Sequence, residues 1–112
     1  MPRPLNLEHL TNQLREFAAK RQWLCFHTPK NLAMALSVEA GELLDHFTWL
    51  TPEESSAVVG NKHSAQEIAS EIADVLIYLV RLADVLEIGL AEAVEAKLAV
   101  NARRFPPSPS GG

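Results

Sequence analysis

The stretch that decides the fold is Ile68-Ala69-Ser70-Glu71-Ile72-Ala73-Asp74-Val75-Leu76-Ile77-Tyr78-Leu79-Val80. Its apolar side chains recur at helical spacing on nearly all sides, which is the pattern of a helix that its neighbours bury. We expect this helix to begin at Ser64, because Glu67 follows three residues later as in a capping box. We expect it to run to about Leu86 and to stop at Gly89.

Three more segments carry the same period, at about residues 5–21, 29–50 and 90–104. Thr28 is placed to cap the second of them, and Thr51 to cap a short acidic turn that follows it. No alternating strand pattern bounded by hairpin turns occurs, so the sequence predicts an all-α fold. Four helices with short connections suggest a four-helix bundle, closed either within the chain or by a partner chain. Because the central helix is apolar nearly all round, we expect an oligomer.

Length and composition favour one compact domain. The chain has 112 residues, and 47% of them are hydrophobic, which is enough for one modest core. We expect the domain to span residues 1–105. Residues 106–112 consist of Pro, Ser and Gly, and we expect them to form a disordered tail.

Charge and cysteine content exclude several classes of protein. The 10 Lys and Arg against 14 Asp and Glu give a net charge of −4, which argues against a nucleic-acid partner. The single Cys25 excludes a disulfide framework and a Cys-rich zinc site. The first residues lack the apolar run of a secretory signal, and no stretch reaches the roughly 18 apolar residues of a membrane span. We therefore expect a cytoplasmic protein with no membrane partner.

Two pairs of acidic residues stand in otherwise apolar helices: Glu39 with Glu42, and Glu71 with Asp74. A three-residue step places both members of a pair on one helix face, close enough to converge on one ion. An ionised carboxylate that is buried without a partner is costly, so these side chains need cations, donors or raised pKa values.

Two kinds of cation can balance the acidic pairs. Structural salt bridges to Arg81 or Lys97 across a bundle are one possibility. A divalent cation explains all four acids better, and oxygen ligands suit Mg²⁺, with Mn²⁺ as a substitute. The Glu-x-x-His pairs of di-iron bundles are absent from both helices.

The pairs are separated by 28 residues, and this arrangement resembles the MazG-like nucleoside triphosphate pyrophosphohydrolases. The surrounding residues resemble the dCTP pyrophosphatase branch of that family in particular. They are Phe17-Ala18-Ala19, Arg21, Trp23, Phe26-His27, Pro29, Asn31, Trp49, residues 74–80, Lys97 and residues 101–106. The resemblance covers nearly the whole chain apart from the tail.

The resemblance implies a MazG-like fold of four-helix-bundle type and a homotetramer that is a dimer of dimers. It also implies Mg²⁺-dependent hydrolysis of (deoxy)nucleoside triphosphates, dCTP-like ones in particular, to the monophosphate and pyrophosphate, which cleans or balances the nucleotide pool. Glu39, Glu42, Glu71 and Asp74 are then the metal ligands. One glutamate of the first pair, Glu39 or Glu42, is expected to position or deprotonate the attacking water.

The remaining candidate residues are expected to bind the substrate. Trp23 and Trp49 flank the acidic helices, and the resemblance favours stacking on a nucleobase over packing in the core. His27 is expected either to hydrogen-bond a base or to cap its loop. Tyr78 lies on the stripe of Glu71 and Asp74, where its hydroxyl can donate to a phosphate.

Three more candidate residues lie on a basic helix face, and one position departs from the family. Lys97, Asn101 and Arg104 fall at steps of four and three residues, so they share a face that we expect to bind phosphate oxygens. A solvated basic stripe is the alternative. Leu14 stands where members of the branch often place a histidine, which removes one base or sugar contact.

Two other functions remain open from the sequence. One is that of the phosphoribosyl-ATP pyrophosphohydrolases, which have similar acidic helices. That function, however, does not explain the two tryptophans as a compact base pocket. A non-enzymatic helical interaction module would use the acids as salt bridges between chains. A substrate panel separates the first alternative, and a metal titration separates the second.

Overall fold

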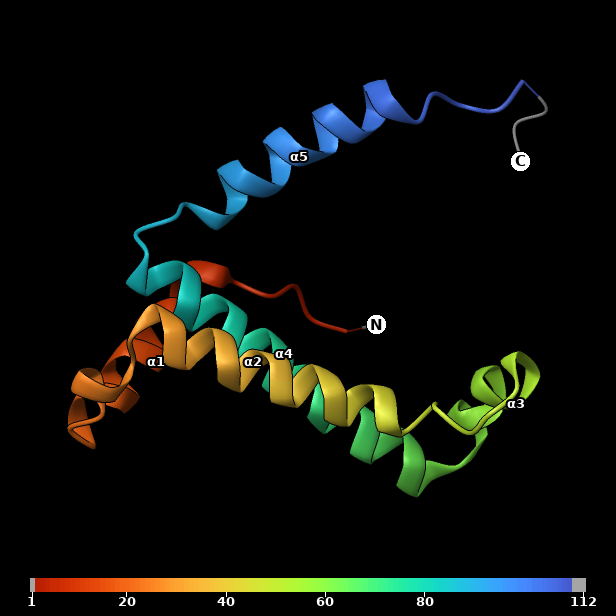
Figure 1. The fold of residues 1–112 in the computed structure, drawn as a ribbon, viewed down its shortest axis with the longest axis horizontal. Helices are drawn as coiled ribbons and strands as arrows, with labels where there is room; N and C mark the ends of the chain where they lie inside the picture. Colours follow the sequence, from red (N-terminus) through yellow and green to blue (C-terminus); the bar gives the residue numbers. More distant parts are fainter. Residues whose placement is uncertain (1, 110–112) are drawn as a thin grey trace.

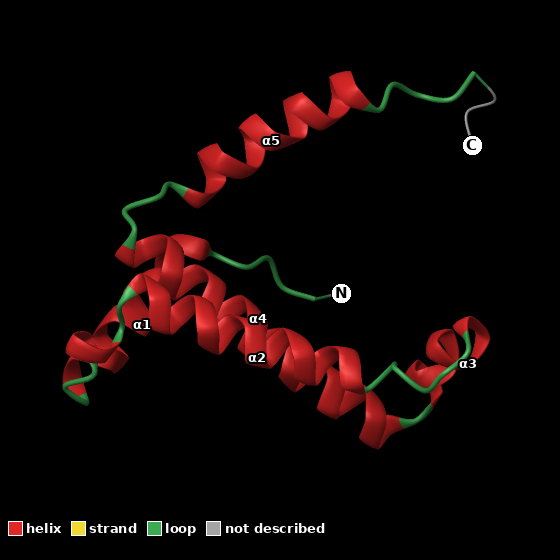
Figure 2. Cartoon of the chain, in the orientation of Figure 1, coloured by secondary structure: helices red, strands yellow, loops and turns green. Residues whose placement is uncertain are grey.

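The structure, a computed structural model, describes residues 2–109, and the part that it describes contains helices and connecting loops but no strand (Figures 1 and 2). This confirms the all-α fold. The helices are α1 (Leu7–Lys20), α2 (Pro29–Asp45), α3 (Pro52–Ala57), α4 (Lys62–Val85) and α5 (Leu90–Arg104), with short 3₁₀ turns at Leu24–Phe26 and Val58–Gly60. None of these helices is both long enough and apolar enough to cross a lipid bilayer.

The body of the molecule is the packing of α2 against α4, which run side by side in opposite directions, with α1 covering one end of α4 (Figure 1). Leu32 of α2 and Val80 of α4 are the largest fully buried side chains, and Ala18 of α1 is buried with them. Burial of such side chains contributes about 1.5 to 3 kcal/mol each. The α2–α4 contact therefore positions everything that projects from these two helices.

Helix α5 leaves this body and projects from it as an arm (Figure 1). Its apolar residues Val94 and Leu98 stay at least half exposed. The described part of one chain thus packs α1, α2 and α4 together but does not close a four-helix bundle around α5. Residues 106–109 of the expected tail are exposed and contain no helix, and residues 110–112 lie outside the described residues.

The helix starts follow local capping chemistry. The Thr28 side chain accepts from the Asn31 backbone N–H, with Pro29 at the first helical position. Thr51 and Glu54 form a reciprocal capping box that starts α3. The expected turn behind Thr51 is thus a six-residue helix.

The predicted start of α4 and the predicted end of α2 were wrong. The capping box expected at Ser64 does not form, because Asn61 adopts an extended conformation one turn earlier and its side chain accepts from the Ser64 N–H. Helix α2 ends at Asp45 rather than near Leu50, because the next turn tightens, with the Phe47 N–H bonded to the Leu44 carbonyl.

The ends of α1 and α4 share one motif, which uses a non-glycine residue in the left-handed region. Gln22 and Glu87 have φ angles of 59° and 57°, and the residue after each donates back to a carbonyl five residues earlier. The predicted stop at Gly89 was therefore wrong, since the turn is made at Glu87 and Gly89 precedes the first residue of α5. This turn directs α5 away from the body.

An ion cluster ties α1 to α4. Arg81 is only 7% exposed and donates to the Asp84 carboxylate at 2.8 Å, while Arg15 of α1 forms a second ion pair with the same carboxylate. The pKa of Asp84 is lowered, first by the hydrogen bond from Arg15. The cluster neutralises a charge that is buried on α4.

We predict that Asp84→Asn lowers the free energy of unfolding by about 2 to 3 kcal/mol, because it leaves the buried Arg81 guanidinium without its anion. Arg15→Gln is the control and should cost clearly less, since Arg15 is largely exposed to solvent. Urea denaturation at a fixed protein concentration measures both. Equal losses for the two variants would contradict the prediction.

The same cluster predicts a pH dependence of stability. Because the folded-state pKa of Asp84 is lowered, the stabilisation is complete above the ordinary aspartate range, near pH 4, and is lost as the pH falls through the lowered value. The stability of Asp84→Asn should change less over that acidic range. Melts of both proteins between neutral and acidic pH make the comparison.

Candidate active site

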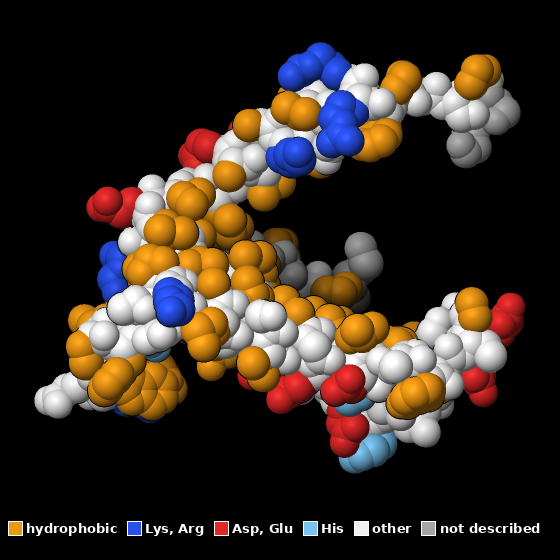
Figure 3. Space-filling view, in the orientation of Figure 1, with side chains coloured by type: hydrophobic (Ala, Val, Ile, Leu, Met, Phe, Trp, Pro, Cys, Tyr) orange, Lys and Arg blue, Asp and Glu red, His pale blue; other side chains and the backbone are white. Residues whose placement is uncertain are grey.

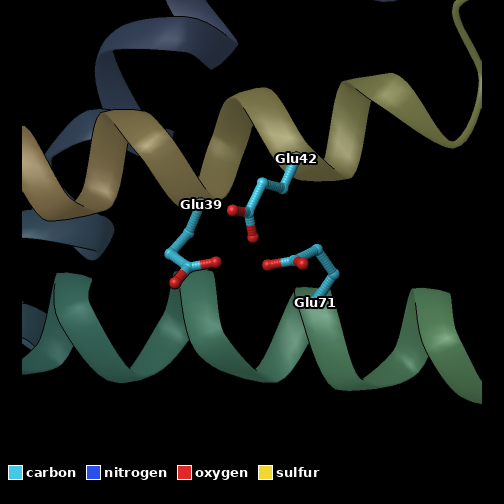
Figure 4. Close-up of side chains that lie close together, drawn as sticks. All are labelled: Glu39, Glu42 and Glu71. Carbon is cyan, nitrogen blue, oxygen red and sulfur yellow. The ribbon is translucent and has the colours of Figure 1, made fainter.

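Three carboxylates converge between α2 and α4. Glu39 and Glu42 project from α2 and Glu71 projects from α4, toward one another across the helix contact (Figure 4). One oxygen of each carboxylate lies within 4.8 Å of the others. The structure thus brings together three of the four predicted metal ligands.

The carboxylate cluster lacks compensating cations. Glu39 Oε2 and Glu71 Oε2 are buried, and no donor in the described residues reaches either atom. The pKa of Glu39 is raised, above all because its protonated form can donate a hydrogen bond to the Glu71 carboxylate. Burial and the charges of Glu71 and Asp74 act in the same direction, whereas Glu42 acts against them. Such an arrangement has the donor set for a hard divalent cation.

The salt-bridge alternative finds no support within the described part of the chain. None of the four predicted acidic ligands forms an ion pair there. Arg81, which was one proposed partner, pairs with Asp84 instead. Lys97, the other, lies on the projecting α5.

Asp74 connects the carboxylate cluster to a pocket. It lies three residues after Glu71 on α4, is half-buried, and lines a cavity of about 280 Å³ between α1, α4 and the turn after α1. The other lining residues are Leu14, Phe17, Ala18, Trp23, His27, Ile77, Tyr78 and Arg81. This volume is close to the lower end of the roughly 300 to 1,000 Å³ typical of small-molecule pockets.

Aromatic rings form one side of this pocket. The Trp23 ring packs edge-on against Phe17 at a centroid distance of 5.7 Å and lies 6.3 Å from the His27 ring. Trp23 is 43% exposed, so its ring is open to a ligand. Trp23, His27 and Tyr78, which were predicted to bind substrate, thus lie in one pocket beside the acids.

The other predicted binding residues are not brought to this pocket within one chain. Trp49 lies after the end of α2 and is 91% exposed, so it is neither part of this chain's core nor of the Trp23 pocket. Lys97, Asn101 and Arg104 lie on α5, apart from the carboxylates (Figure 1).

Phe17 and Arg81 were not predicted as pocket residues. Arg81 follows Tyr78 by three residues and Asp74 by seven, so the helical spacing already placed it on the same stripe. Phe17 is one of the residues that resemble the dCTP pyrophosphatase branch, but no role was predicted for it. Leu14, the departure from the family, lines the pocket with an apolar side chain.

Comparison with known proteins establishes the family. The family model described as MazG-like matches residues 34–110. The chain belongs to the MazG-like family. A pyrophosphatase from Archaeoglobus fulgidus, solved as a crystal structure, is 44% identical, has a TM-score of 0.79, and aligns over 95% of this chain and 97% of its own.

Curated relatives of this MazG-like chain are similarly close. dCTP pyrophosphatase 1 from Homo sapiens is 41% identical over 105 residues, and that from Bos taurus is 40% identical over 100 residues. The alignments cover 94% and 89% of this chain but 61% and 59% of those proteins. The chain therefore spans about three fifths of the length of these relatives. MazG-like pyrophosphatases generally depend on a divalent metal, and the carboxylate cluster agrees with that dependence.

We predict that Glu71→Gln abolishes stabilisation by Mg²⁺ without unfolding the protein. Removing one of three crowded like charges relieves repulsion, so the metal-free melting temperature should be unchanged or raised. The mutant also loses a cation ligand, so added Mg²⁺ should no longer shift its melt. Glu67→Gln, one turn earlier on α4 and outside the cluster, is the control and should keep the shift. An undiminished Mg²⁺ shift in Glu71→Gln would exclude Glu71 from the site.

Proposed function

We propose that this protein hydrolyses (deoxy)nucleoside triphosphates, dCTP-like pyrimidine nucleotides in particular, to the nucleoside monophosphate and pyrophosphate in the presence of Mg²⁺. The observation that carries the proposal is the position of the carboxylate cluster of Glu39, Glu42 and Glu71 directly beside an aromatic pocket, with Asp74 at their junction. A triphosphate needs a cation, whereas a base needs an aromatic face. The carboxylates that can hold the cation and the pocket that offers the aromatic face are adjacent along α4.

The names of the relatives support this reaction over the alternatives. Two of them are called dCTP pyrophosphatase 1, and the similar crystal structure is called a pyrophosphatase. Phosphoribosyl-ATP hydrolysis has no such support. The interaction-module alternative would use the acids in salt bridges between chains, whereas the convergence of three carboxylates within one chain favours a cation.

The residues present fit a divalent cation. Glu39 Oε2 and Glu71 Oε2 are buried oxygens with no donor in the described chain, and all the ligand atoms are carboxylate oxygens, as Mg²⁺ prefers. Glu39, Glu71 and Asp74 would hold the ion with Glu42. When bound, Mg²⁺ would neutralise the triphosphate and make water a better nucleophile.

The protein's own side chains divide the remaining work. Glu42 is the exposed member of the cluster, so its carboxylate is open to a water molecule and is suited to accept its proton. Trp23 offers a ring face for stacking on the base. Tyr78 lines the pocket one helical turn after Asp74, so its hydroxyl is suited to donate to a phosphate.

A homo-oligomer, specifically a tetramer built as a dimer of dimers, would complete this site. Figure 3 shows hydrophobic side chains along α5 and along the edge of the body that faces it. Leu98 and Phe105 are each more than 60% exposed, as is Leu44 of α2, and Gly41 has open space around the position of a Cβ. These surfaces suit burial against another copy. Trp49, Lys97, Asn101 and Arg104 would then contact a nucleotide held by a second copy.

The reaction is tested by pyrophosphate release across a nucleotide panel. We expect release from dCTP and related pyrimidine nucleotides with Mg²⁺, formation of the monophosphate in equal amount, and no reaction with a chelator. Formation of the diphosphate and phosphate would contradict cleavage at the α-phosphorus. Phosphoribosyl-ATP in the same panel tests the alternative substrate.

The assembly is tested by light scattering. We expect a tetramer at micromolar protein, because exposed apolar surface of this extent is unfavourable in water. Leu98→Lys on α5 should shift the mass toward smaller species, whereas Glu92→Lys on the polar side of α5 should not. A monomer at micromolar concentration would refute the assembly.

A further inference from the structure

A buried arginine lies against the wall of the aromatic pocket. Arg81 Nε donates to His27 Nδ1 at 3.0 Å, and the Nη1 atom of the same guanidinium donates to Asp84 at 2.8 Å. Asp84 is held from its other side by Arg15. The His27 ring is therefore fixed by a chain of contacts that runs from α1 through α4 to the turn that carries His27.

The chemistry of the arginine determines where the imidazole carries its hydrogen. A guanidinium only donates hydrogen bonds, so His27 Nδ1 must be the acceptor, and the neutral ring then carries its hydrogen on Nε2. A second proton would place a cation against Arg81. The pKa of His27 is accordingly lowered, first by burial and then by the Arg81 charge.

The ring so fixed lines the pocket that Trp23 and Tyr78 share. Nδ1 is engaged by Arg81, so the Nε2 hydrogen is the only polar hydrogen that the ring can offer to a ligand, and no acceptor in the described residues takes it. Leu14, Phe17 and Ile77 provide apolar wall around it. In an apolar pocket, a ligand that leaves this donor unpaired loses affinity.

We propose that Arg81 is a specificity-determining positioning residue, which holds His27 as a neutral Nε2–H donor, so that the pocket selects nucleobases with a carbonyl oxygen or imine nitrogen at that edge. The inference rests on the proposed function, because it places a base in the Trp23 pocket. A neutral Nε2–H donor attracts an acceptor atom of a base but does not attract phosphate. An imidazolium would attract phosphate. Arg81 thus acts through His27 and need not touch the substrate.

The first test is the tautomer of His27 in the unaltered protein, read from long-range ¹H–¹⁵N correlations of its imidazole. We expect the Nε2–H form, neutral at pH 7, with its Nε2 signals displaced when the α,β-imido analogue of dCTP and Mg²⁺ are added. An Nδ1–H ring, an imidazolium, or signals indifferent to the analogue would overturn the proposal. This measurement needs neither turnover nor a variant, so failure of the proposed reaction alone leaves its result unchanged.

The second test compares affinities by calorimetry. Arg81→Leu should weaken binding of the α,β-imido analogue about tenfold, the value of one hydrogen bond, and leave binding of inorganic tripolyphosphate with Mg²⁺ unchanged. Arg15→Gln is the matched control, since it removes the other partner of Asp84 without touching His27, and it should weaken neither ligand. Equal loss for both ligands in Arg81→Leu would show a merely structural role. If Arg81→Leu does not fold, the tautomer measurement decides.

Discussion

The antiparallel contact of α2 with α4 is the constraint on which the rest of the structure depends. It buries Leu32 of α2, and Glu39 follows Leu32 by seven residues on the same helix face, where its carboxylate meets that of Glu71 from α4. Like charges at such distances repel, and the pKa of Glu39 is raised, first by a hydrogen bond with the Glu71 carboxyl and further by burial and by the charges of Glu71 and Asp74. The apolar contact therefore holds together a cluster that electrostatics alone would separate. A cation bound among these carboxylates would replace their mutual repulsion with attraction to the ion, and would thus stabilise the folded chain.

The parts of the site that sequence reasoning predicted are those that helix geometry fixes. A three-residue step determines one face whatever the surroundings, so Glu39 could be paired with Glu42 and Glu71 with Asp74. The apolar pattern of α4, which runs nearly all round the helix, did not indicate which face meets α2. Helix ends were harder to predict, because neighbouring caps compete. Asn61 and Ser64 are both good capping residues, and the extended backbone at Asn61 decides between them.

The remaining features depend on the paths of helices and loops in space, which the spacing of residues in the sequence does not determine. Lys97 and Asn101 share a face of α5, as predicted, but the path of α5 is set by the left-handed turn at Glu87, a residue with no particular preference for that conformation. Trp49 lies on a segment with little packing in its own chain. In the proposed oligomer such residues would acquire their environment from another chain, so a single sequence predicts their chemistry better than their location.

The charges around the pocket also give a nucleotide one orientation in the proposed reaction. A buried guanidinium beside a binding pocket would ordinarily attract phosphate. In this pocket Asp84 neutralises the charge of Arg81, and the Arg81 Nε–H is directed at His27. Apart from Asp74, which lies at the end nearest Glu71, the pocket is thus lined by apolar, aromatic or charge-balanced side chains. In the proposed reaction a cation held at the carboxylates would attract the triphosphate, whereas the aromatic end of the pocket favours the base, so charge would orient the nucleotide before any specific contact forms.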